Sequence, residues 1–241
     1  MENNITSASE FSIGSVLSST YATLLRNPGV FFGICFIALI PMIATDIIQH
    51  LYPSNTRGGF TAGFGIINML VQGAISYAVY QSLRGNTVTI SESVSRCTPK
   101  LGSLIGVSIL TFFGIALGFL LLVIPGIILM CKWAVTVQTC VVENLGAQES
   151  LKRSSELTKD YRVKIFFLSL IGLVSNLFVL FLSNFIGILL FPKQEIIVIF
   201  LSNFIFLIPY TFWDVMTAVI YYRLREAKEG TAIDNLANVF D

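Results

Sequence analysis

Long apolar runs separated by short polar segments make up most of this chain of 241 residues. A run of about 20 apolar residues is long enough to cross a membrane as a helix. Five such runs are present, and the third is much the longest. Their bounds are 30–48, 60–80, 101–142, 165–191 and 196–222.

The third run is too long for one crossing. Its 42 residues would form a helix of about 63 Å, and the hydrocarbon core of a bilayer is only about 30 Å thick. Pro125 and Gly126 interrupt the run and predict a tight turn, with helices over 101–124 and 127–143. The pattern therefore predicts an all-α, polytopic bundle of six transmembrane helices.

The distribution of positive charge supports this count, because Lys and Arg stay on the cytoplasmic side of a membrane protein. With six spans and a cytoplasmic N-terminus, the inner segments hold twelve Lys and Arg, and the outer segments hold only Arg57 and Lys193. A five-span arrangement divides these charges five against nine. We expect both 1–28 and 223–241 to be cytoplasmic, with 29–222 as the transmembrane domain.

Three polar segments have the periodicity of amphipathic helices lying under the membrane. They cover 11–26, 90–101 and 146–161. The third is the most regular, because its apolar and charged residues occupy opposite faces. Its cations and the one that follows are the predicted contacts with a partner or with lipid: Lys152, Arg153, Lys159 and Arg162.

Ionisable residues at membrane depth are costly and are commonly functional. Lys132 falls in the predicted fourth span and Asp214 in the sixth, where they could form a polar path or a switchable ion pair. A structural pair, or Lys132 reaching outward toward Asp46, is the alternative that we favour. Asp46 and His50, one turn apart at the outer end of the first span, are expected to pair.

Other polar and small residues in the spans predict helix packing. The amides of Asn68, Gln72, Asn176, Asn184 and Asn203 can form hydrogen bonds between helices. Glycines along one stripe of the third span permit close helix approach, within the bundle or, alternatively, in a homodimer. These glycines are Gly102, Gly106, Gly114 and Gly118.

The composition and the absence of known motifs argue against catalysis, nucleotide binding and metal binding. Charged residues make up 12% of the chain and hydrophobic residues 54%, with a mean hydropathy of +0.78, which excludes an ordinary soluble enzyme or a nucleic-acid-binding protein. There is one histidine and no nucleotide-binding glycine motif. The four cysteines form no C-x-x-C pair and are expected to be buried thiols. We expect no catalytic residues, metal site or cofactor.

Two stretches resemble a known family. Ile124 to Leu129, Val141 to Glu143 and Ser150 to Lys159, together with Tyr221 to Gly230, resemble the YciC-like bacterial membrane proteins. The related membrane domains found beside glycerophosphodiester phosphodiesterases share these features. The resemblance implies six spans and an inner-membrane location, but no phosphodiesterase activity.

Size and topology also resemble the permease subunits of bacterial ABC exporters, including those of microcin export and immunity systems. This resemblance implies export of a peptide or amphiphile, such as a peptide antibiotic, with a separate cytoplasmic ATPase as partner. The alternative function is a scaffold that organises the membrane and binds lipid through its amphipathic helices. A membrane-embedded enzyme is the least favoured hypothesis.

Overall fold

The computed structural model describes residues 11–52 and 59–230, with side chains throughout except at 59–66. Arg57 and the two ends of the chain, 1–10 and 231–241, lie outside the described residues. Within the described residues the elements are all helices, so the all-α prediction is confirmed. They are α1 (Ile13–Arg26), α2 (Pro28–Leu51), α3 (Gly59–Leu83), α4 (Ile90–Cys97), the 3-10 turn η1 (Thr98–Lys100), α5 (Leu101–Leu121), α6 (Val123–Lys132), α7 (Thr136–Val142), α8 (Ala147–Leu157), α9 (Arg162–Leu190) and α10 (Glu195–Glu229).

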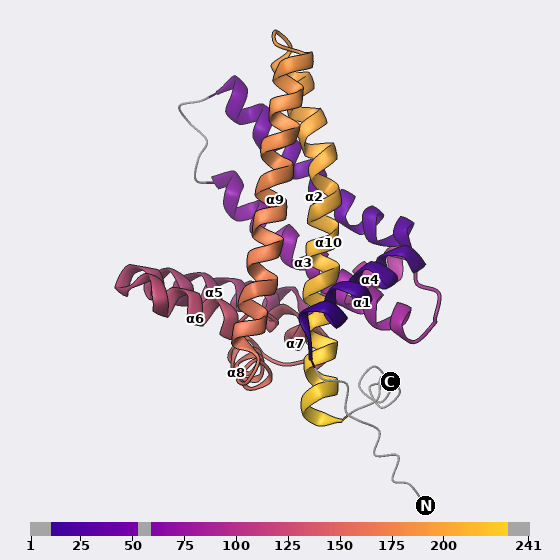
Figure 1. The fold of residues 1–241 in the computed structure, drawn as a ribbon, viewed down its shortest axis with the longest axis vertical. Helices are drawn as coiled ribbons and strands as arrows, with labels where there is room; N and C mark the ends of the chain where they lie inside the picture. The colour runs from indigo at the N-terminus through magenta and orange to yellow at the C-terminus, as the bar shows by residue number, and fades with distance from the viewer. Residues whose placement is uncertain (1–10, 53–58, 231–241) are drawn as a thin grey trace, which may run out of the picture.

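An antiparallel pair, α9 and α10, forms the long axis of the molecule, and α2 and α3 run obliquely past it (Figure 1). Close packing of the pair depends on glycine. A Cβ atom at Gly172 would lie 2.0 Å from the ring of Trp213, and one at Gly187 would lie 2.7 Å from Val198. Glycine at both positions therefore lets large side chains of α10 lie directly on the backbone of α9.

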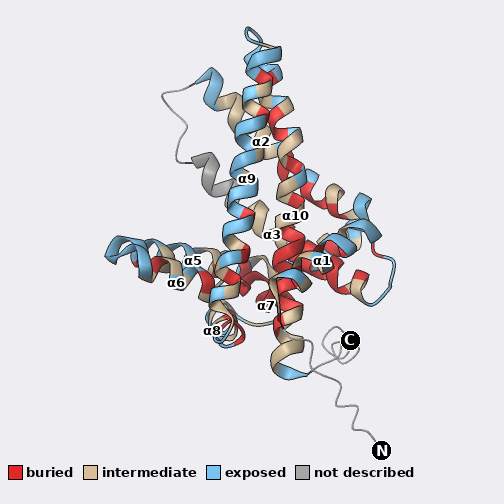
Figure 2. Cartoon of the chain, in the orientation of Figure 1, coloured by how far each residue is buried: buried red, intermediate tan, exposed pale blue. Residues whose placement is uncertain are grey.

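The lower third of α10 is the centre of a compact base, which we define as α1, α4, α7 and α8 together with this part of α10. Every residue of α10 from Asp214 to Tyr222 is buried (Figure 2). Val16 of α1 and Leu157 of α8 belong to the same core. A helix that is buried on all sides lies in the interior of a protein, and here the neighbouring helices cover it.

A hairpin of α5 and α6, which we call the arm, extends sideways from the base (Figure 1). Its tip is exposed and apolar: Leu120 is 82% exposed and Ile124 71%. The chain reverses at Leu122, which is extended (φ −166°, ψ 155°). The predicted turn at Pro125 and Gly126 is therefore three residues too late. Proline is accommodated in the first turn of α6, because N–H groups there have no partner within the helix.

The predicted fourth span, 127–143, is divided rather than continuous. Helix α6 ends at Lys132, a turn follows over 133–135, and α7 begins at Thr136. All seven residues of α7 are buried. The apolar character of this stretch is explained by burial in the base, which hydropathy alone does not distinguish from burial in lipid.

The other predicted helices agree closely with the structure. The amphipathic segments 11–26 and 146–161 contain α1 and α8, and 90–101 contains α4. By length and composition, five described segments are apolar enough to cross a membrane. They are Pro28–Leu51, Ile90–Leu121, Val123–Val142, Arg162–Leu190 and Glu195–Glu229.

Candidate functional site

A buried carboxylate lies on α10 where it faces α3. Asp214 is only 1% exposed. Gln72 donates a hydrogen bond of 3.4 Å from Nε2 to one carboxylate oxygen, Oδ1. The other oxygen, Oδ2, is buried and has no partner at standard hydrogen-bond geometry, although the hydroxyl of Tyr210 lies close enough to interact with the carboxyl. Buried polar atoms in native proteins are almost always paired, so this oxygen is an unusual feature that a bound group could explain.

A second polar contact joins the same two helices one turn away. The hydroxyl of Tyr210 donates a hydrogen bond of 3.1 Å to Oδ1 of Asn68. Pro209 precedes Tyr210 inside α10. A proline has no N–H to donate to the carbonyl four residues earlier, which allows a helix to bend. The polar cluster of Asn68, Gln72, Tyr210 and Asp214 therefore lies beside a weak point of α10.

A cavity of about 440 Å³ opens beside this cluster, between α3, α9, α10 and the end of α6. Most of its wall is apolar, and the polar part comes from the polar cluster together with Ser169, Asn176 and Thr217. A cavity of this size, apolar with a few polar groups in one place, is typical of a site for a small ligand. Its wall includes Met130, Ile165, Phe166, Leu170, Leu173, Phe206, Trp213 and Ile220.

Lys132 does not pair with Asp214 in the described part of the chain. Its carbonyl oxygen instead accepts hydrogen bonds from Ser154 Oγ (3.0 Å) and Thr158 Oγ1 (3.2 Å) of α8. Lys132 therefore lies beside α8, and its near neighbours Met130 and Ala134 line the same cavity as Asp214. The continuous fourth helix predicted from the sequence had placed it much further from α8.

The polar residues at the far end of α2 also differ from the prediction. His50 Nδ1 lies 3.1 Å from Glu195 Oε2, at the start of α10. Asp46 Oδ2 accepts a hydrogen bond of 2.8 Å from Asn203 of α10. Asp46 and His50 thus each contact α10, and the expected pair between them does not form.

The predicted amides divide into two groups. Asn68, Gln72 and Asn203 form hydrogen bonds between helices, as expected. Asn176 and Asn184 donate instead to carbonyl oxygens of their own helix.

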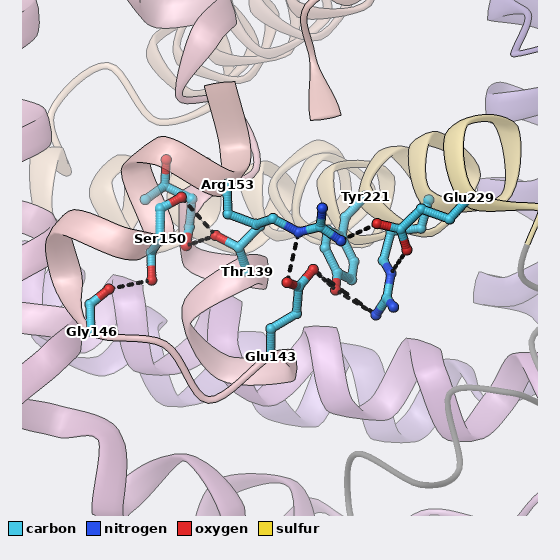
Figure 3. A network of polar contacts seen from close by, with 9 residues as sticks. Thr139, Glu143, Gly146, Ser150, Arg153, Tyr221 and Glu229 are labelled. Carbon is cyan, nitrogen blue, oxygen red and sulfur yellow. Dashed lines mark hydrogen bonds and ion pairs between the residues drawn. The ribbon is translucent and has the colours of Figure 1, made fainter. Parts of the chain in front are cut away.

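An ion-pair network fastens α7 and α8 to the end of α10 (Figure 3). Arg153 of α8 donates from Nε to Glu143 Oε2 at 2.7 Å and forms a second ion pair with Glu229. Glu143 also accepts a hydrogen bond of 2.9 Å from the hydroxyl of Tyr221. Arg225 pairs with Glu229 at 2.9 Å. Arg153 is therefore an internal tie and not a freely exposed cation.

Small hydroxyl residues seat α8 against α7. Ser150 Oγ donates a hydrogen bond of 2.7 Å to the carbonyl of Gly146, and Thr139 Oγ1 donates one of 3.1 Å to the carbonyl of Ser150 (Figure 3). Ser150, Ser154 and Leu157 are buried. This is the face of α8 that the sequence pattern assigned to the membrane surface, and in the structure the protein covers it.

The ion pairs at this end of the base shift the pKa values of the Arg153 guanidinium and the Asp160 carboxyl. Burial alone would lower the pKa of the Arg153 guanidinium, but hydrogen bonds to Glu143 and Glu229 raise it above its ordinary value. A hydrogen bond from Lys228, whose Nζ lies 2.9 Å from Asp160 Oδ2, lowers the pKa of that exposed carboxyl. Both groups remain charged at neutral pH.

Two of the predicted contact cations remain available on the surface. Lys152 and Lys159 are exposed, Arg162 is half-buried, and Arg153 belongs to the network. The surface of α8 that a partner or lipid headgroup can reach is therefore smaller than predicted.

The glycine stripe of α5 packs mainly within the arm and the base. A Cβ atom at Gly114 would lie 2.3 Å from the ring of Trp133, and one at Gly118 would lie 3.0 Å from the backbone of Gly126. Gly106 faces Ala147 of α8, and Gly102 has no atom within 4 Å of such a Cβ. This packing supports the contacts within one chain, and no feature of these glycines points to a homodimer.

All four cysteines are buried and free. No group of three metal-binding side chains occurs among the described residues.

Comparison with known proteins adds a membrane relative. The chain is 27% identical, over 109 residues, to the UPF0259 membrane protein SG1383 of Sodalis glossinidius (strain morsitans). The aligned stretch is 45% of this chain and 43% of the relative, so the match spans less than half of either protein. No family model and no solved structure matches the chain. The relative and the apolar helices together support a multi-pass membrane protein.

Sequence reasoning identified Asp214 but missed the site around it. Gln72 was expected to serve packing, and Tyr210 and Trp213 were not singled out. Pro209, directly before Tyr210, was the available signal, because a proline inside an apolar helix often marks a place where function requires a bend. The ion pair of Arg153 with Glu229 carries no signal of this kind, because 76 positions separate the two residues in the chain.

Proposed function

We propose that this protein is a bacterial inner-membrane protein, with both termini in the cytoplasm, that binds an amphiphilic molecule beside Asp214 and acts as the permease subunit of an exporter. The observation that carries the proposal is the unpartnered oxygen of Asp214, buried next to a cavity with an apolar wall. An intramembrane ionisable residue is by default a candidate functional residue.

The site specifies the chemistry of its ligand. A buried acceptor without a partner costs about 1–3 kcal/mol, and more when it is charged. A ligand that places an N–H donor on Asp214 Oδ2 removes this cost. The apolar wall would take the rest of the ligand by the hydrophobic effect. A primary or secondary amine attached to an apolar body fits both demands, and a hydrophobic peptide with a free amine, such as a peptide antibiotic, belongs to this class.

The network around Arg153 supplies a route for coupling to a separate ATPase. Exposed Lys152 lies on α8 and exposed Lys159 directly follows its C-terminal end, where a cytoplasmic partner could dock. Arg153 ties the same helix to the end of α10, and α10 carries Asp214. A displacement of α8 would therefore pull on α10, and Pro209 is the point at which α10 can bend.

A scaffold that binds anionic lipid is the second candidate. It is favoured by exposed Lys152 and Lys159 on the same base as an exposed apolar arm. Each Lys near an anionic surface contributes about 1 kcal/mol to membrane attraction. Under this hypothesis the cavity beside Asp214 has no role.

Purification from native membranes, together with an export assay, distinguishes the exporter function from the scaffold function. The exporter proposal predicts that an ATPase copurifies and that Lys152→Glu with Lys159→Glu releases it. Asp214→Asn should abolish export or self-protection without releasing the ATPase. The same substitution at exposed Asp160 is the matched control and should leave export intact. If no ATPase is recovered and the charge reversals change only lipid binding, the scaffold function is favoured instead.

A further inference from the structure

The arm carries no charge between its two ends. The cations that flank it both lie at the end that joins the base. No Asp, Glu, Lys, Arg or His occurs between 101 and 131. Lys100 directly precedes α5, and Lys132 is the last residue of α6. A segment that crosses a bilayer usually has polar residues at both ends, whereas the tip of this arm, from Leu120 to Ile124, is apolar and exposed.

Both ends of the arm are fixed to the base beside α8. The carbonyl of Lys132 accepts hydrogen bonds from Ser154 and Thr158 of α8. On the other helix, a Cβ atom at Gly106 would lie 3.0 Å from the Cβ of Ala147, the first residue of α8. Lys132 is therefore at the level of α8, which carries Lys152 and is followed by Lys159.

The free part of the arm is too short to cross a bilayer. Helix α6 has ten residues, which gives a length of about 15 Å against a hydrocarbon thickness of about 30 Å. The inner part of α5 belongs to the base, where Leu104 and Val107 are buried. The outer part of α5 packs against α6 where Gly118 meets Gly126, and Gly114 meets Trp133 directly after the end of α6.

Two backbone hydrogen bonds span the turn at the tip. The N–H of Leu122 donates to the carbonyl of Gly118 at 3.1 Å, and the N–H of Gly126 donates to the carbonyl of Leu122 at 3.4 Å. Inside hydrocarbon, backbone groups without partners are very costly. These hydrogen bonds reduce the number of unpaired backbone groups at the tip, which lowers the cost of placing it in lipid.

We infer that the arm enters the bilayer from the side of the base and remains in that leaflet, where the acyl chains of lipids cover its apolar surface. The crossings are then α2, α3, α9 and α10, four rather than six. A hairpin that returns to the side from which it entered contributes no net crossing. The charge distribution that predicted six spans is therefore equally satisfied, and both termini stay on the side of the base.

Single cysteines labelled with a membrane-impermeant maleimide test this inference. The four native cysteines, all buried, are replaced by serine in the full chain. Leu122→Cys at the tip should resist labelling from both faces of the membrane and react only after denaturation. Lys132→Cys should react from the cytoplasmic face to the same extent as Lys152→Cys. Lys193→Cys, in the turn between α9 and α10, is the control for the periplasmic face.

Three labelling results would each contradict the inferred position of the arm. If Leu122→Cys reacts from the periplasmic face as readily as Lys193→Cys, the arm crosses the bilayer. If Leu122→Cys reacts from the cytoplasmic face, the arm lies in water. A Lys132→Cys that resists labelling from the cytoplasm also overturns the inference. Should Leu122→Cys fail to accumulate, Ile124→Cys replaces it, since Ile124 is exposed at the same tip.

Discussion

Arg153 in the middle of α8 forms an ion pair with Glu229, the last residue of α10, although 76 residues separate them in the chain. Glu143 at the end of α7 binds the same guanidinium, so one side chain joins three helices. The three side chains are only partly exposed, between 15% and 25%. Such a pair is screened less by water than a surface pair.

Removing the ion pairs of Arg153 should lower the stability of the base. We expect Arg153→Ala to lower the free energy of unfolding by about 1–3 kcal/mol, because two half-buried carboxylates lose a charged partner. Lys152→Ala, next in the sequence and exposed, should change it by less than about 0.5 kcal/mol. The measurement is the thermal unfolding midpoint of each variant in the same detergent. Equal midpoints for the two variants would show that the ion pairs contribute no stability.

Two glycines of one helix should respond in opposite ways to alanine. In Gly114→Ala the new methyl group would meet the ring of Trp133, and we expect a loss of about 1–3 kcal/mol from overpacking. In Gly102→Ala nothing lies within 4 Å of the new group, and the better helix propensity of alanine should gain about 0.5–1 kcal/mol. Both are measured as unfolding midpoints.

A second substitution checks the cause of the Gly114 effect. Trp133→Leu removes the ring atoms that the methyl group would meet. Added to Gly114→Ala, it should therefore recover part of the lost stability. If the double variant is no more stable than the sum of the two single effects predicts, the loss does not arise from this contact.

The pair between Asp160 and Lys228 predicts a small dependence of stability on pH. The pKa of Asp160 is lowered in the folded protein. A carboxyl of this kind stabilises the fold at pH values above its unfolded pKa of about 3.9, and this contribution is lost as the pH falls through the folded-state pKa. Asp160→Asn should therefore lower the unfolding midpoint slightly at pH 7. The difference from the unchanged protein should disappear in acid, and a difference that persists there would contradict the pairing.

Much of the helical pattern could be predicted from the sequence, because apolar runs and helical periodicity report burial directly. The ends of α2 and α9 lie within three residues of the ends of the apolar runs, whereas α10 continues seven residues beyond its run, to Glu229. The prediction is least accurate at 127–143, because the helix is broken at 133–135 and α7 is covered by other helices of the chain. Its residues are buried by α3, α5 and α8, and the pattern of a short segment covered by protein resembles that of one covered by lipid.

The site was less predictable than the fold. A lone Asp at membrane depth is visible in any apolar run, and Asp214 was identified on that basis. Its environment depends on how α3, α9 and α10 pack, which in turn depends on Gly172 beneath Trp213. Arg153 was assigned to an exposed basic face because periodicity gives the direction of a side chain, but it does not reveal a partner that folds onto that face from a distant helix.

The fluorescence of Trp213, which lines the cavity beside Asp214, tests the proposed binding site most directly. The chain has two tryptophans, so Trp133→Phe leaves Trp213 as the reporter in protein reconstituted into lipid nanodiscs. The probe is a primary alkylammonium with bromine at the end of its chain, and a brominated alcohol of equal length is the comparison. We expect saturable quenching by the ammonium that disappears in Asp214→Asn and persists in Asp160→Asn. Equal quenching with and without the Asp214 carboxylate would contradict an amine-binding site in this cavity.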